Sequence, residues 1–268
     1  MIDNFLKNYD EYEKVGRAYI LKKRGNEAFE SFYLDSYGGN SLDNNENDLI
    51  SKTLSDERSR KTVENLKDIK GAVLDLGTGQ GFLSGALKRI NDKIKVVGYD
   101  ISPKACMKSV ENDFVDYSVQ GSDSLPFRDS IFDGVIMGDL IEHLLMPETF
   151  LEEIFRVLKD GGALSLSTPN VSFLDNRLKM LKGEFPKTEC NKDVEVWNAQ
   201  HIRFFNFYTI RSILEKKGFS VEKIEGVRFM KSYKIRRPIK KIFKYLPDNL
   251  THQMMVAKAF KKNEKQYY

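Results

Sequence analysis

The sequence predicts an α/β protein with a doubly wound, mostly parallel sheet and helices on both faces. After residue 70, short apolar runs alternate with segments of helical periodicity, a pattern typical of parallel strands joined by crossover helices. The first run leads directly into the glycine-rich turn Gly77-Thr78-Gly79-Gln80-Gly81, a common start of such folds. With 268 residues, 41% of them hydrophobic, the chain can bury a core of this kind.

Seven strands are expected from the apolar runs. Five of them alternate with helical segments: AVLDLG (72–77), KVVGYD (95–100), VDYSVQ (115–120), FDGVIMG (132–138) and GALSLST (162–168). The clearest crossover helix is 147–158, which begins with proline, has apolar residues at helical spacing and is expected to stop at Gly161-Gly162. A helix over 208–218 then leads to strands over 219–227 and 254–260.

The N-terminal segment is predicted to be a helical cap. Residues 4–30 carry Tyr and Phe at roughly helical spacing, residues 37–48 are rich in turn formers, and a helix is expected from about residue 49 to Lys67. The expected organisation is a cap over 1–70 and an α/β domain over 71–268 with insertions at 170–200 and 228–252.

Cysteine usage and the N-terminal residues indicate a cytoplasmic protein. Cys106 and Cys190 lie far apart in the sequence, so neither a zinc ribbon nor a disulfide framework is expected. The first residues are acidic and mixed, unlike a signal peptide, and no apolar run approaches the roughly 20 residues that span a bilayer.

Positive charge is concentrated near the C-terminus. From residue 228 onward, twelve Lys and Arg stand against Asp248 and Glu264, a net charge of +10, which leaves −6 on residues 1–227 because the chain carries +4. Within this segment, residues 231–247 interleave cations with Ile, Phe and Tyr. This stretch indicates peripheral contact with an anionic membrane, a clamp on a phosphorylated or polyprenyl-linked substrate, or a solvated helix face.

The glycine turn and the next strand predict a site for a nucleotide-like ligand. Gly77, Gly79 and Gly81 let a ligand approach the backbone at the start of a helix, and the second strand ends in Asp100, whose carboxylate can accept hydrogen bonds from ribose hydroxyls. A dinucleotide-binding turn would have glycine where Phe82 stands. Asp75 would repel a pyrophosphate but would suit an ammonium group, so a methionine-containing cofactor is favoured.

Four segments resemble class I (Rossmann-like) S-adenosylmethionine-dependent methyltransferases, in the order and at the spacing of that family. They are VLDLGTGQG, VVGYDIS, LPFRDSIFDGVIMGDLIEHL and FLEEIFRVLKDGGALSLSTPN. The resemblance is close over 71–170 and extends to 201–227, and it implies that the strand at 254–260 is antiparallel to the other six. The cofactor contacts that it implies are Asp75, Gly77, Thr78, Gly79 and Gly81 around the methionine part, Asp100 on the ribose, Ile101 beside the adenine, Ser122 or Asp123 on the adenine amino group, and Asp139 at the floor of the site.

The fourth strand narrows the chemistry to methylation of an oxygen. It ends in MGDL, unlike the (Asp/Asn)-Pro-Pro-(Tyr/Phe) of similar enzymes that methylate planar amino nitrogens, and no cysteine stands where a base-C5 methyltransferase needs its nucleophile. His143 and His201 are candidate general bases because imidazole titrates near neutrality. For His143 a packed helix start is an equally good interpretation.

A divalent metal is a second interpretation of the same residues. Asp139-Leu-Ile-Glu142-His143 resembles the Glu-x-x-Glu-His metal pattern of ubiquinone-biosynthesis O-methyltransferases and of small-RNA 2′-O-methyltransferases, with Asp139 in place of the first Glu. The resemblance implies that Asp139, Glu142, His143 and His201 are ligands of Mg²⁺ or Mn²⁺, which would lower the pKa of an acceptor hydroxyl.

The functional prediction is S-adenosylmethionine-dependent O-methylation of a small molecule, either a quinone precursor, a glycan or a lipid-linked intermediate. Two other classes stay open. An RNA 2′-O-methyltransferase with a divalent metal is favoured by the metal-like pattern and the basic segment, although no RNA-binding module is recognisable. A non-catalytic, cofactor-binding membrane adaptor would bind the cofactor without turnover.

Overall fold

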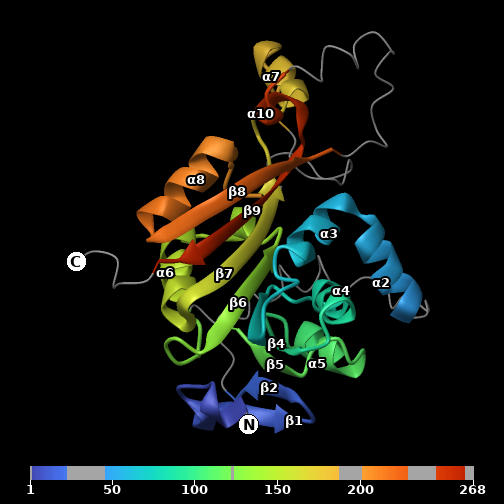
Figure 1. The fold of residues 1–268 in the computed structure, drawn as a ribbon, viewed down its shortest axis with the longest axis vertical. Coiled ribbons are helices and arrows are strands. Elements are labelled where there is room, and N and C mark those ends of the chain that lie inside the picture. Colours follow the sequence, from blue (N-terminus) through green and yellow to red (C-terminus); the bar gives the residue numbers. More distant parts are fainter. Residues whose placement is uncertain (1, 23–45, 122–123, 187–200, 229–245, 263–268) are drawn as a thin grey trace.

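The protein forms a single sheet of nine strands in the order β1-β2-β5-β4-β3-β6-β7-β9-β8 (Figure 1). This computed structural model describes residues 2–22, 46–121, 124–186, 201–228 and 246–262. The strands are β1 (Tyr12–Val15), β2 (Ala18–Leu21), β3 (Gly71–Leu76), β4 (Ile94–Asp100), β5 (Tyr117–Gln120), β6 (Phe132–Gly138), β7 (Leu158–Pro169), β8 (Phe219–Val227) and β9 (Met254–Lys261). The α-helices are α2 (Glu46–Ser55), α3 (Glu57–Glu64), α4 (Phe82–Ile90), α5 (Pro103–Glu111), α6 (Pro147–Val157), α7 (Leu174–Leu181), α8 (Phe207–Lys216) and α10 (Asp248–Thr251), and the 3-10 helices are η1 (Ile2–Asn4), η2 (Tyr9–Glu11) and η3 (Ile141–His143).

The seven strands predicted from the sequence are all present. Strands β5, β4, β3, β6 and β7 pair in parallel, and β9 lies antiparallel between β7 and β8. The predicted fold class and the antiparallel last strand are therefore confirmed, although the sheet has nine strands where seven are predicted.

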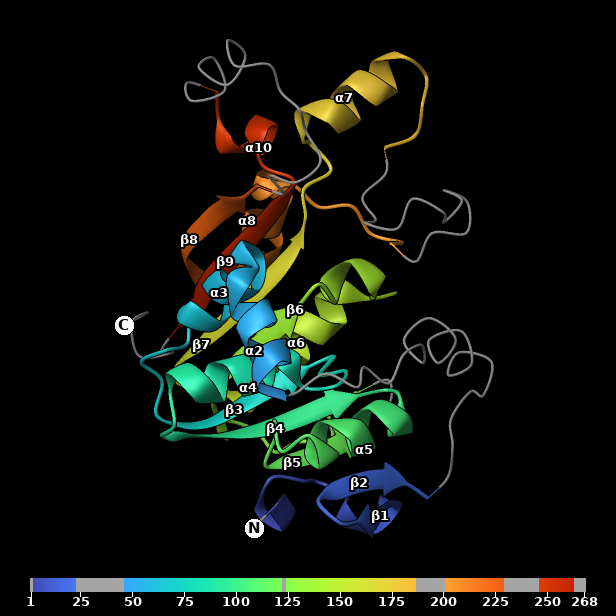
Figure 2. The ribbon, with the colours of Figure 1, turned by 90° about the vertical axis from the view of Figure 1, so that its right-hand side faces the viewer.

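The two additional strands correct the prediction of helix over residues 4–30. Strands β1 and β2 form a hairpin in which Val15 pairs with Ala18, so the loop contains only Gly16 and Arg17. Gly16 has φ +61°, which suits the tight turns that join twisted antiparallel strands. The hairpin joins the sheet because β2 pairs in parallel with β5, as both views show (Figures 1 and 2).

Two predicted helix boundaries are also corrected. The helix expected from 49 to 67 is divided at Asp56, whose side chain caps α3 by accepting a hydrogen bond from Ser59 N at 3.0 Å. Helix α6 ends at Val157, before the predicted stop at Gly161-Gly162. The chain is extended from Leu158, where it pairs with Phe132 and begins β7.

Apolar residues on the two faces of the sheet bury helices on both sides. Alternate residues of a strand face opposite sides, so Leu74 of β3 packs in the cluster with α6 and α8, whereas Val73 packs in the cluster with α3 and α4. This arrangement explains why the central strands are apolar at nearly every position: both of their faces are covered. Among the described helices, none is long and apolar enough to cross a membrane.

The predicted insertions follow the carboxyl ends of β7 and β8. The first contributes α7, which projects beyond the sheet together with α10 (Figures 1 and 2). Residues 187–200 of that insertion, and residues 229–245 of the basic segment, lie outside the described residues. The expected membrane contact through 231–247 therefore stays a prediction.

A buried polar link attaches α3 to the sheet. Ser165 of β7 donates a hydrogen bond to Thr62 O at 2.7 Å and accepts one from the Asn65 side chain at 3.1 Å. All three residues are buried, so loss of the hydroxyl leaves an amide donor and a carbonyl acceptor inside the protein.

We therefore expect Ser165→Ala to lower the free energy of unfolding by about 1–3 kcal/mol. Urea denaturation followed by circular dichroism measures this change. Ser220→Ala on β8, where the side chain is exposed, is the matched control and should change it by less than about 0.5 kcal/mol. Equal effects of the two substitutions would contradict the structural role of the buried link.

Candidate active site at the carboxyl ends of the strands

The glycine turn joins β3 to α4 in the conformation that the sequence predicts. Gly77, Gly79 and Gly81 have φ of +68°, +52° and +87°, in the region that favours glycine. At Gly81 a side chain would also be obstructed, because a Cβ there would lie 2.9 Å from Phe114 Cβ. The turn therefore depends on these glycines for its shape.

Asp100 links this turn to the end of β4. Its Oδ2 accepts a hydrogen bond from Gly79 N at 2.9 Å, and its Oδ1 accepts one from Ser102 N at 2.9 Å. Burial raises the pKa of Asp100, and these backbone hydrogen bonds oppose the increase. Each carboxylate oxygen keeps a second lone pair, so Asp100 can also accept hydrogen bonds from hydroxyl groups of a ligand.

Asp75 lies beneath the turn and is 1% exposed. Its Oδ2 accepts hydrogen bonds from Thr78 Oγ1 at 3.0 Å and from Ser84 Oγ in the first turn of α4. Burial raises the pKa of Asp75 from 3.8 to about 6, against the opposing effect of these two hydroxyls, and the charge of Asp100 raises it further. In the structure Asp75 holds the turn together from below.

A second polar group follows β6. Asp139 has φ +48°, and its backbone N–H donates to Ser167 O at 3.0 Å. Ser167 Oγ donates to Asp139 Oδ1 at 2.7 Å, and Arg58 of α3 forms an ion pair with the other carboxylate oxygen. Sequence reasoning missed Arg58, because an arginine in a charged helix carries no signal of a partner 81 residues away.

Glu142 and His143 lie three and four residues after Asp139, in η3. Thr168 Oγ1 donates to Glu142 Oε2 at 3.0 Å, whereas Glu142 Oε1 has no hydrogen-bond partner among the described residues although it is buried. Burial, and then the negative charge of Asp139, raise the pKa of Glu142 well above its ordinary value. A buried oxygen of this kind is costly unless a ligand or a cation satisfies it.

His201 is brought to this position by backbone hydrogen bonds. The N–H groups of Ile202 and Arg203 both donate to Glu142 O at 3.0 Å, and the Arg203 guanidinium donates to Leu145 O. The imidazoles of His143 and His201 contact each other edge to face, with 4.7 Å between ring centroids and 75° between planes.

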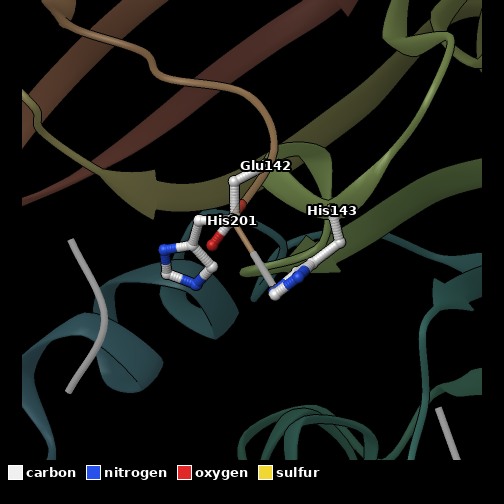
Figure 3. A group of neighbouring side chains, drawn as sticks. All are labelled: Glu142, His143 and His201. Carbon is white, nitrogen blue, oxygen red and sulfur yellow. The ribbon is translucent and has the colours of Figure 1, made fainter. Parts of the chain in front are cut away.

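Glu142, His143 and His201 form a group that could hold a cation. One ligand atom from each residue lies within 4.8 Å of the others (Figure 3). The sequence predicts Asp139 as a fourth member, but this group does not include it, because Arg58 and Ser167 bind its carboxylate. The two predicted adenine contacts, Ser122 and Asp123, lie outside the described residues.

The glycine turn and the histidine group belong to one region of the molecule. A Cβ on Gly77 would lie 3.2 Å from the Leu140 side chain, in the loop that carries Asp139 and Glu142. The glycine turn follows β3, Asp100 ends β4, and Asp139, Glu142 and His143 follow β6, at the edge of the sheet where ligands bind in doubly wound folds.

Several known proteins are similar to this chain. Residues 74–166 match the protein family described as "Methyltransferase domain". The human mitochondrial ubiquinone biosynthesis O-methyltransferase is 28% identical over 191 residues, covering 68% of this chain and 49% of that protein. The ubiquinone/menaquinone biosynthesis C-methyltransferase UbiE of Desulfotalea psychrophila is 32% identical over 123 residues, covering 43% of this chain and 50% of that protein.

Solved structures share the fold. A putative methyltransferase from Bacillus halodurans superposes with a TM-score of 0.55 over 76% of this chain and 99% of its own, at 22% identity. The chain spans about half the length of the curated relatives named above.

The buried Asp75 predicts a pH-dependent stability. A carboxyl whose pKa is raised on folding stabilises the folded state below its unfolded pKa of 3.8, and this contribution is lost as pH rises through about 6. Because Asn does not titrate, the free energy of unfolding of Asp75→Asn minus that of wild type should increase by on the order of 2–3 kcal/mol from about pH 4 to about pH 7.5.

Urea denaturation at a series of pH values, without ligand, measures this difference. Asp92→Asn in the exposed turn after α4 is the matched control, whose difference from wild type should stay constant. A constant difference for Asp75→Asn as well would contradict the buried, destabilised carboxylate.

Proposed function

We propose that the chain transfers the methyl group of S-adenosylmethionine to an oxygen of a small or lipid-linked acceptor, such as a quinone precursor. The match of residues 74–166 to a methyltransferase domain and the resemblance of the glycine-turn segments to class I (Rossmann-like) enzymes support this reaction. One observation carries the proposal. The glycine turn after β3 is fixed to the carboxylate at the end of β4 by the hydrogen bond from Gly79 N to Asp100 Oδ2. A nucleoside with a charged amino-acid tail can bind at this position, with its ribose at Asp100 and its tail at the glycine turn.

The ion pair between Arg58 and Asp139 supports an amino-acid tail. S-adenosylmethionine carries a carboxylate and an ammonium on its methionine part, and the guanidinium and the carboxylate of this pair are complementary to them. Both side chains are about one quarter exposed, so a ligand can reach them. We assign Arg58 to the cofactor's carboxylate and Asp139 to its ammonium.

The residues next to the histidines support an apolar acceptor. Leu145 and Met146 follow His143 and are 55% and 64% exposed, and Ile202 and Phe204 follow His201 and are each 40% exposed. Exposed apolar side chains gathered around a polar group are typical of sites for ligands with apolar parts. The curated relatives include both O- and C-methyltransferases of quinone pathways, in keeping with an acceptor of this class.

Methylation of an oxygen rests on the histidine group. The sulfonium of the cofactor already supplies a leaving group, so the protein needs only to align the acceptor hydroxyl for in-line attack and to remove its proton. Either imidazole can accept that proton, and the buried Glu142 beside them can stabilise the cation that forms.

The same group also fits a divalent metal. Two imidazoles and the Glu142 carboxylate, whose Oε1 has no hydrogen-bond partner among the described residues, form a donor set that suits Mn²⁺, Co²⁺ or Zn²⁺ better than Mg²⁺, because imidazole is the softer ligand. We propose Glu142, His143 and His201 as the ligands, without Asp139. A bound ion would supply Lewis acidity at the acceptor hydroxyl.

Loss of the Asp100 carboxylate should weaken cofactor binding. We expect Asp100→Ala to reduce the affinity for S-adenosylmethionine by one to two orders of magnitude, about 1.4–2.8 kcal/mol, because charge-assisted hydrogen bonds to the ribose are lost. Isothermal titration calorimetry measures this affinity. Asp92→Ala, in the exposed turn after α4, is the control that should bind as wild type does, and tight binding of NAD by the wild type would overturn the assignment.

Metal binding is tested directly with Mn²⁺. If the group holds an ion, the wild type should bind Mn²⁺ in calorimetry, and Glu142→Gln and His201→Ala should each weaken binding at least about tenfold. His252→Gln is the matched control, because His252 lies outside the group. Absence of Mn²⁺ binding, with methyl transfer that survives EDTA, would assign the histidines to proton transfer alone.

A further inference from the structure

The N-terminal hairpin of β1 and β2 is attached to β5, the strand next to the end of β4 where the adenosine is proposed to bind. Strand β2 pairs with β5 through Ala18 and Tyr19 only. Beyond these residues the backbone ladder is replaced by a side chain, because Leu21 N donates a hydrogen bond to Gln120 Oε1 at 3.1 Å. Tyr12 of β1 adds a bond from its hydroxyl to Gln120 O at 3.5 Å.

The Gln120 side chain reaches in the other direction to the end of β4. Its Nε2 donates to Ile101 O at 3.3 Å, so one amide bridges the hairpin and the residue after Asp100. The orientation of the amide is fixed, since Leu21 N can only donate and Ile101 O can only accept. The side chain is fully buried, which makes either bond costly to lose.

Backbone pairing around Gln120 also joins β5 to the end of β4. Asp100 pairs with Gln120 across the β4–β5 ladder, and Gly121 N donates to Asp100 O at 2.6 Å. Residues 100 and 101 are therefore held by the turn through Gly79 on one side and by Gln120 and Gly121 on the other. The Gln120 side chain is therefore a direct link between the hairpin and Ile101, in addition to the backbone ladders.

We propose that Gln120 is a positioning residue for the adenosine half of the cofactor and that, through it, the N-terminal hairpin forms part of the cofactor site. The inference rests on the proposed function, which places ribose and adenine at Asp100 and Ile101. The proposal gives a role to the hairpin of β1 and β2, which contributes no residue to the glycine turn or to the histidine group.

The proposal is tested with Gln120→Met, which keeps the length of the side chain and removes both hydrogen bonds. The affinities for S-adenosylhomocysteine and for 5′-methylthioadenosine, which lacks the amino-acid part, should both fall by the same factor, about three- to tenfold, measured by calorimetry. Arg58→Ala should instead lower the affinity for S-adenosylhomocysteine and leave the affinity for 5′-methylthioadenosine unchanged. This contrast separates adenosine positioning from a general loss of binding.

Ser118→Ala, a buried substitution two residues earlier on β5, is the matched control and should bind both ligands as wild type does. If Gln120→Met does not fold, judged by thermal melting, Gln120→Leu takes its place, because it also removes both hydrogen bonds, and it should weaken the binding of both ligands by the same factor. In the wild type, S-adenosylhomocysteine should slow hydrogen exchange of the Leu21 amide.

Wild-type affinity of the folded Gln120 variants for both ligands, or no change in exchange at Leu21, would overturn the inference while leaving the proposed function intact. A wild type that binds neither ligand would overturn the proposed function itself.

Discussion

The hydrogen bond between Gly79 N and Asp100 Oδ2 is the constraint on which the candidate site depends. It joins the turn after β3 to the end of β4 and so fixes the position of each relative to the other. The bond requires a backbone that turns sharply enough to aim its N–H at the neighbouring strand, and the positive φ of Gly79 provides it. Asp75 supports the same turn from inside the protein, where its carboxyl is kept by Thr78 and Ser84.

The histidine group is built on a different principle. Its position is set by Glu142, whose backbone oxygen accepts two N–H groups from the segment after His201 and whose side chain is held by Thr168. The contact between Gly77 and Leu140 brings this group against the glycine turn. Two arrangements that are far apart in the sequence therefore meet at the carboxyl edge of a single sheet, as a methyl donor and an acceptor would require.

The sequence predicts well those features that depend on local pattern. The apolar runs predict the five parallel strands, and the closely spaced glycines predict the turn after the first of them. Both features are present. The hairpin at Tyr12–Leu21 is the exception: its aromatic residues recur at roughly helical spacing and predict a helix, whereas its turn is signalled by Gly16 alone. Arg58 and the exclusion of Asp139 from the histidine group depend on an ion pair between residues 81 positions apart, which no local pattern encodes.

The backbone hydrogen bonds that hold His201 have a consequence for how far the sequence around it can vary. Ile202 and Arg203 contribute main-chain N–H groups, which every residue except proline possesses, so these two hydrogen bonds do not depend on the identity of the side chains at 202 and 203. The chain between β7 and His201 can thus lengthen, shorten or change composition while the imidazole returns to the same place. A change in that segment would alter the surroundings of the two imidazoles and would leave the glycine turn and Asp100 as they are.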